Sequence, residues 1–240
     1  YDAVVLANAT CLSRAQRTAL RDFVAGGGGL IGDFESGLYD EAGRSDEQPE
    51  WLEVLGVRRV TGMFVPSRSE DYLHVLQAEP PLGAFGVGEL LPRPMYLLEV
   101  EPQPTARVPA VATVPLGKPY AVPKGLTDRP GLVLSELGRG RVAYSPGAVM
   151  AAFQAFGMAQ HEALIDAMVD WAVRRRQPLR VEAPASVYVE WRRKGPKTDL
   201  VHLVNNTAEM HRPVGEFVPV HDIRIRLERD RTARVRSLRL

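Results

Sequence analysis

The spacing of hydrophobic residues predicts a strand, a helix and a second strand at the start of the chain. Residues 3–7 form a continuous apolar run, which is typical of a strand buried on both faces of a parallel sheet. Ser13 and Gln16 have the spacing of a capping box, so a helix is expected to begin there. Gly26 is expected to take the left-handed conformation that ends this helix, and residues 30–34 form the next strand. The unit is therefore predicted to be a right-handed βαβ crossover in a parallel sheet.

The pattern then changes once, near Pro178, from helical spacing to strict alternation. We therefore expect two domains: an α/β domain over residues 1–177 with a mostly parallel, doubly wound sheet, and a β-rich domain over residues 178–240 that forms an incomplete β-sandwich portion. The other elements expected in the first domain are helix 50–55, strands 57–65, 72–76, 96–100 and 108–114, a hairpin over 131–145 and helix 161–175.

Both ends of the sequence suggest a piece of a longer protein. The chain begins without methionine on the residues of a core strand, and it ends at Leu240 on an alternating strand pattern. A doubly wound sheet normally has further strand and helix units before a strand such as residues 3–7. We therefore expect additional domains in the parent protein.

Charge and composition exclude several classes of partner. Thirty basic and twenty-nine acidic residues give a formal net charge of +1, so nothing global favours nucleic acid or anionic lipid. Arginines are frequent between Arg224 and Arg239, but they alternate with apolar residues and so indicate the solvent face of strands. No apolar run approaches the roughly 18 residues that a membrane helix needs. With one cysteine and no signal segment, we expect a cytoplasmic protein.

Three residues are candidates for catalysis. Asp33 and Glu35 follow a strand, where alternation would place both carboxylates on one side as an acid and a base. Cys11 is the only thiol and follows the first strand. The alternative interpretations are solvated loop carboxylates and an inert, partly buried cysteine.

Metal and cofactor sites are not expected. The histidines lack the i, i+4 spacing of a helical metal pair, and a single cysteine cannot form a multi-cysteine site. The glycine run 26–29 precedes a strand instead of opening a helix, so it offers no helix N-terminus to a phosphate. The histidines are His74, His161, His202, His211 and His221.

Longer stretches of the sequence resemble one known family. LSRAQRTALRDFVAGGGGLIGDFESGLYDEAG, followed by WLEVLGV, is similar to the middle domain of family 42 β-galactosidases and related glycoside hydrolases, which is called the trimerisation domain. The hairpin GRGRVAYSPG and the β-rich end continue the similarity over most of the chain. The resemblance implies a class I glutamine amidotransferase-like, or flavodoxin-like, fold.

The resemblance also implies a role without catalysis. Where amidotransferases carry a nucleophilic cysteine after a core strand, this chain has Glu35 and Ser36, and where they read Phe-His-Pro-Glu it has residues 144–147, YSPG. In the similar family the catalytic carboxylates belong to a preceding TIM barrel. The resemblance therefore implies a homo-oligomer, trimer or dimer, that packs on an N-terminal barrel, with Ser36, Tyr39 and Asp40 in a loop at the edge of a carbohydrate site.

Two other functions remain open from the sequence. One is a divergent amidotransferase-like hydrolase that uses Cys11, or Asp33 with Glu35. The other is a carbohydrate-binding module in which Tyr39, Trp51 or Trp191 stacks on sugar rings.

Overall fold

The computed structural model describes residues 1–45, 49–64, 71–77, 82–118, 121–173, 179–184, 186–195, 198–207 and 216–227. The chain divides into two compact units, Tyr1–Arg174 and Arg175–Leu240. The boundary expected from the sequence, between residues 177 and 178, lies outside the described ranges.

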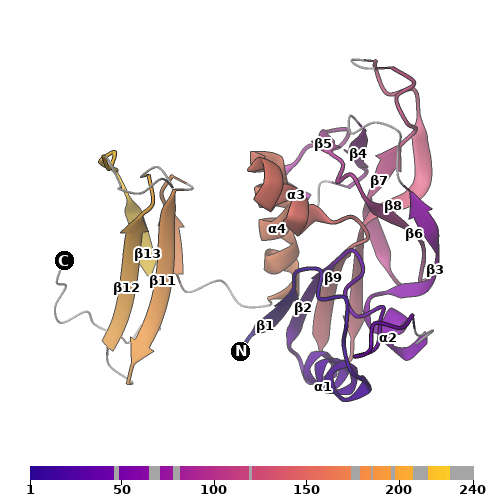
Figure 1. Ribbon diagram of the computed structural model, residues 1–240, viewed down its shortest axis with the longest axis horizontal. Coiled ribbons are helices and arrows are strands. Elements are labelled where there is room, and N and C mark those ends of the chain that lie inside the picture. The colour runs from indigo at the N-terminus through magenta and orange to yellow at the C-terminus, as the bar shows by residue number, and fades with distance from the viewer. Residues whose placement is uncertain are drawn as a thin grey trace. The chain divides into compact units, whose positions relative to one another are not determined.

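One seven-stranded sheet organises the first unit (Figure 1). Its strands are β1 (Ala3–Leu6), β2 (Gly29–Asp33), β4 (Tyr72–Val75), β5 (Leu90–Pro92), β7 (Arg107–Thr113), β8 (Leu126–Leu137) and β9 (Gly140–Ser145). They lie in the order β1-β2-β9-β8-β7-β4-β5. β2 pairs in parallel with β1 and with β9, whereas every later neighbour pair from β9 to β5 is antiparallel.

The α/β class is confirmed, but the sheet is mixed where the sequence predicts a mostly parallel one. β8 and β9 are joined by Gly138 and Arg139 alone, and so short a connection joins antiparallel neighbours. The parallel arrangement is therefore confined to β1, β2 and β9.

The first crossover has the predicted cap. Helix α1 (Arg14–Ala25) begins after Ser13, whose hydroxyl oxygen accepts from Gln16 N at 3.3 Å, while Gln16 Oε1 accepts from Ser13 N at 2.8 Å. The prediction for the helix end is wrong by one residue. Gly26 has a right-handed φ of −71°, and Gly27, with φ 113°, makes the turn.

Helices cover both faces of this sheet. On one face α1, α2 (Pro49–Val54) and part of the ribbon of β3 (Val57–Phe64) and β6 (Leu97–Pro102) enclose a core around Leu30 and Val142. On the other face α3 (Val149–Phe156), α4 (Ala159–Ala172) and the 3₁₀ turn η1 (Leu82–Ala84) enclose a core around Ile31 and Ala143. Neighbouring residues thus pack on opposite faces, as strand alternation requires.

Two helical details differ from the pattern-based expectation. The fourth helix begins at Ala159 and ends at Ala172, two residues earlier at its start than expected. Helix α3 is not predicted, because all of its eight residues except Gln154 are apolar and the sequence there shows no polar face. Gly157, with φ 59°, ends α3 and separates it from α4.

The hairpin turn between β8 and β9 docks against the end of α1. Arg139 donates its backbone N–H to Ala25 O at 3.1 Å and its guanidinium to Gly26 O at 2.8 Å. A Cβ atom on Gly140 would overlap the carbonyl oxygens of Val24 and Gly28. This contact is close enough that only glycine fits at position 140.

The described residues of the second unit form two antiparallel ribbons. They are β10 (Leu179–Glu182) with β13 (Arg224–Leu227), and β11 (Val187–Lys194) with β12 (Thr198–Asn205). Arg224 and Arg226 are exposed and lie 3.7 and 3.3 Å from Glu182, so they line a solvent face. The arginines after residue 227, and His211, lie outside the described ranges.

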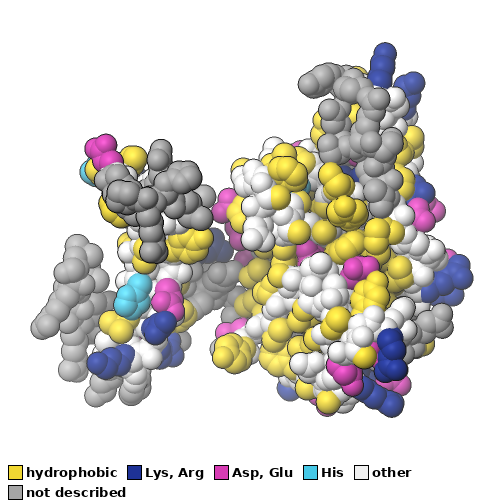
Figure 2. Space-filling model, in the orientation of Figure 1, with side chains coloured by type: hydrophobic (Ala, Val, Ile, Leu, Met, Phe, Trp, Pro, Cys, Tyr) yellow, Lys and Arg dark blue, Asp and Glu magenta, His cyan; other side chains and the backbone are white. Residues whose placement is uncertain are grey.

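Hydrophobic side chains are prominent on the surface of the first unit that Figure 2 shows, whereas many charged ones lie along its right and lower rim.

Candidate functional site

The carboxyl ends of β1, β2 and β9 meet at one edge of the sheet, where ligands commonly bind in open α/β folds. We call the residues there the strand-end site: Asn8, Asp33, Phe34, Glu35 and Ser145. They lie at or directly after the ends of the three parallel strands.

Asp33 joins three separate segments at this site. Its side chain is fully buried, and its two carboxylate oxygens accept from Asn8 N at 2.7 Å and from Met150 N at 2.9 Å. Asn8 follows β1 in a left-handed conformation, φ 47°, and Met150 lies in the first turn of α3. Both oxygens are therefore engaged in holding the fold.

Burial governs the charge of this carboxyl group. Removal from water raises the pKa of Asp33 above 3.8, and the hydrogen bonds from Met150 and Asn8 oppose that rise only in part. Burial also raises the pKa of Tyr144, and the charges of Asp33 and Glu35 raise it further. Tyr144 is thus a permanent hydrogen-bond donor at neutral pH.

Phe34 occupies the sharp turn that follows β2. Its φ of 48° is left-handed, which is rare for a residue with a bulky side chain. Tyr144 Oη donates to Phe34 O at 2.5 Å, and Phe34 N donates to Ser145 O at 2.8 Å, so two bonds to β9 hold the turn. The Phe34 side chain is buried, and its ring centroid lies 6.1 Å from that of Tyr96. A strained turn of this kind can present a nucleophile, but here it carries an apolar side chain.

The serines nearby are used within the fold. Ser36 is fully buried and donates to Leu6 O at 2.9 Å or Asp33 O at 2.6 Å. Ser145 is also buried, and its hydroxyl lies 3.0 Å from Gly147 O and 3.3 Å from Gly131 O. Ser36, proposed from the sequence for a substrate-edge loop, therefore has no exposed side chain.

Glu35 and Tyr39 are the partly exposed polar pair of the site. Tyr39 Oη donates to Glu35 Oε1 at 2.9 Å, and this bond is the main reason that the pKa of Tyr39 is raised. The carboxylate of Asp40 accepts from the backbone N–H and from the guanidinium of Arg44, and these hydrogen bonds lower the pKa of Asp40. Asp33 and Glu35 have separate partners, because the left-handed Phe34 between them breaks the alternation assumed from the sequence.

Cys11 is exposed, which corrects the expectation of a partly buried thiol. Its backbone forms an isolated β-bridge with that of Tyr39, and its sulfur accepts a hydrogen bond from Thr10 Oγ1 at 3.6 Å. Among the described residues no hydrogen bond joins this thiol to a histidine. His161, for example, is buried and bonds to Pro92 O at 2.9 Å.

The aromatic candidates for sugar stacking differ in exposure. Trp51 is 2 % exposed and donates from Nε1 to Ser36 O at 3.0 Å, so its ring faces cannot reach a ligand. Trp191, on β11, is half-buried beside Asp199 and under the guanidinium of Arg193. Tyr188, on the same strand, is 66 % exposed and was not singled out by sequence reasoning.

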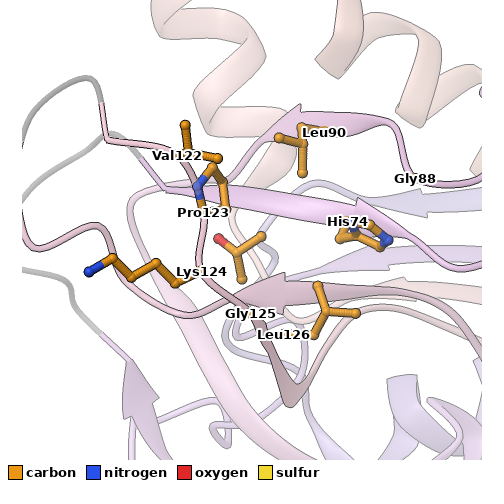
Figure 3. A pocket seen from close by; sticks show the side chains of 9 residues that line it. His74, Gly88, Leu90, Val122, Pro123, Lys124, Gly125 and Leu126 are labelled. Atoms are coloured by element: carbon orange, nitrogen blue, oxygen red, sulfur yellow. The ribbon is translucent and has the colours of Figure 1, made fainter.

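A pocket of about 370 Å³ lies elsewhere, between residues of β4, β5 and β7 and the segment 122–126 at the start of β8 (Figure 3). Its walls include His74, Leu90, Val122 and Leu126, and the Lys124 side chain extends away from His74. Among the described residues that line it, the polar side chains are those of His74, Thr113 and Lys124. Within the described ranges no cluster of three or more potential metal ligands occurs.

No family model matches this sequence, and no curated protein matches it. Solved structures do share its fold. Gan42B, a GH42 β-galactosidase from G. stearothermophilus, matches 87% of this chain and 27% of its own with 20% identity and a TM-score of 0.59. The β-galactosidase of Bacillus circulans sp. alkalophilus matches 87% and 28% with 18% identity and a TM-score of 0.61.

A third neighbour is α-L-fucosidase isoenzyme 2 from Paenibacillus thiaminolyticus, which matches 95% of this chain and 34% of its own with 13% identity and a TM-score of 0.61. The chain thus spans about a third or less of the length of these enzymes. In the part of the chain that the structure describes, no helix has the length and apolar character needed to cross a membrane.

Proposed function

We propose that this chain is a non-catalytic part of a longer glycoside hydrolase, similar to the trimerisation domain of family 42 β-galactosidases. The observation that carries the proposal is the strand-end site. Its strained turn holds the apolar Phe34, and the buried carboxylate beside it, Asp33, accepts hydrogen bonds from two backbone N–H groups. The scaffold of a reactive turn is present without a reactive side chain.

The fold shared with parts of two β-galactosidases and a fucosidase supports the same proposal, because each of those chains is about three times longer or more. The catalytic carboxylates are then supplied by a TIM barrel in the N-terminal part of the parent protein. The three parallel strands are part of a doubly wound, amidotransferase-like sheet. Packing against the barrel and assembly of a homo-oligomer are the roles left to this chain.

In the parent protein the partly exposed pair Glu35 and Tyr39 is the part of the loop that edges the substrate site. Ser36 is buried and Asp40 is paired with Arg44, so the proposal assigns the contact to Glu35 and Tyr39. A side chain at the rim of a sugar site affects binding more than the chemical step.

The test compares two purified proteins, this chain and the product of its complete reading frame, on aryl galactosides and aryl fucosides. Only the longer protein is expected to hydrolyse them, and light scattering is expected to show a trimer or dimer. In the longer protein Tyr39→Phe is expected to raise KM with kcat unchanged, and the exposed Glu162→Gln on α4 serves as the control. Hydrolysis at enzyme-like rates by the 240-residue chain alone would refute the proposal.

A further inference from the structure

The outer edge of β1 is an open strand edge. β1 pairs with β2 alone, and no other described strand of the first unit lies beside it (Figure 1). The Asp2 carbonyl accepts from Gly29 N at 2.9 Å and Asn8 N donates to Asp33, so the even-numbered residues face β2. By strand alternation the backbone N–H and C=O groups of Ala3 and Val5 point away from the sheet.

This edge lacks the features that protect strand edges. Residues 3–6, AVVL, contain neither charge nor proline, and no register shift interrupts their pairing with β2. The opposite edge of the sheet, β5, is only three residues long and ends in Pro92. The two edges therefore differ, and only β1 is suited to take another strand.

The side chain of Val5 identifies the face that is incomplete. Leu6 and Val4 pack in the core beneath α1, whereas Ala3 packs in the core beneath α4. Val5 therefore points to the α4 face, but α4 lies over β9 and β2. Val5 remains 52 % exposed in the middle of an apolar strand.

The handedness of crossovers then fixes what would cover Val5. The connection β1-α1-β2 steps towards β9 and carries α1 on the face opposite α4. A right-handed connection that steps in the other direction, away from β1, carries its helix on the α4 face. A second copy that paired its own β1 here would satisfy the N–H groups but leave Val5 without a helix above it.

We infer that the β1 edge binds a parallel strand from the polypeptide encoded before Tyr1, and that the helix following this strand covers Val5 beside α4. The chain then returns to β1 through one more strand and helix. Two such units require roughly 60 residues. The inference rests on the proposed function in one respect, since both need a longer polypeptide. The neighbours of similar fold are longer, because this chain matches only 27% to 34% of their length.

Amide hydrogen exchange tests the strand. In the 240-residue chain the Ala3 and Val5 amides should exchange rapidly, and in the protein extended to the start of its reading frame they should exchange on the order of 100-fold more slowly. Ile31, in the middle of the sheet, is the slow reference in both. Rapid exchange at Ala3 and Val5 in the extended protein would overturn the inference, as would protection in the short chain caused by self-association, which light scattering detects.

A substitution tests the helix. Val5→Lys should lower the melting midpoint of the extended protein by roughly 4 °C or more and leave that of the short chain nearly unchanged. Val204→Lys, at a strand valine of 57% exposure in the second unit, is the matched control and should leave both unchanged. An extended protein in which Val5→Lys has no effect refutes the inference.

Glycosidase assays on the same extended protein keep the two proposals apart. Hydrolysis with rapid exchange at Ala3 and Val5 refutes this inference alone, whereas slow exchange without hydrolysis refutes the proposed function alone.

Discussion

Replacing Phe34 by alanine and by glycine separates the loss of its buried contacts from the backbone strain of the turn after β2. The side chain is 8% exposed, so truncation to alanine removes buried contacts and leaves a cavity, at a cost of about 3–5 kcal/mol. The left-handed φ of 48° costs about 1–2 kcal/mol with phenylalanine or alanine at this position, and glycine avoids that cost. Both variants should be less stable than the natural protein, with Phe34→Gly about 1 kcal/mol more stable than Phe34→Ala.

Phe85 is the matched control, because it is 5% exposed and is absent from the residues with positive φ. There the glycine variant should be less stable than the alanine variant by about 0.5–1 kcal/mol, the ordinary order. Guanidinium unfolding followed by helical circular dichroism reports on the first unit, which contains all the described helices. If Phe34→Gly proves less stable than Phe34→Ala, the argument from backbone strain is wrong.

Three further predictions concern the same unit. Tyr144→Phe removes the buried bond to the carbonyl of the left-handed residue and should cost about 1–2 kcal/mol in the same unfolding assay. Because the folded-state pKa of Asp33 is raised above 3.8, the stability that this carboxyl group contributes is largest below that pH and is lost as the pH rises. Unfolding measured at several pH values should therefore show that, with rising pH, the natural protein loses stability relative to Asp33→Asn. Gly140→Ala should cost about 3 kcal/mol through its overlap with Val24 O, whereas Gly117→Ala, which has nothing within 4 Å, should be neutral in thermal melts.

Local patterns in the sequence were enough to predict the first crossover. The capping pair Ser13 and Gln16 acts over three residues, so its signal is complete within the sequence. The position of the left-handed glycine was off by one, because four consecutive glycines offer equivalent choices and packing against the β8–β9 turn decides between them.

The hairpin of β8 and β9 was predicted from its glycine-containing turn, but the pairing of the other later strands could not be predicted in the same way. β7 pairs with β4 and β8 across long stretches of sequence, and no local spacing encodes such pairings. The acid and base hypothesis for Asp33 and Glu35 assumed extended backbone between them. The left-handed Phe34 is stabilised by Tyr144, which is 110 residues away, so the sequence around residue 34 gives no sign of it.

β9 connects the parallel strands β1 and β2 to the antiparallel part of the sheet, and this has a consequence for synthesis on the ribosome. It pairs with β2 on one side and with β8 on the other, so until residue 145 has emerged the β1–β2 pair has no partner in the rest of the sheet. Nascent chains that stall before that point should expose the apolar β2 strand and depend on chaperones, whereas those that stall beyond α4 should not.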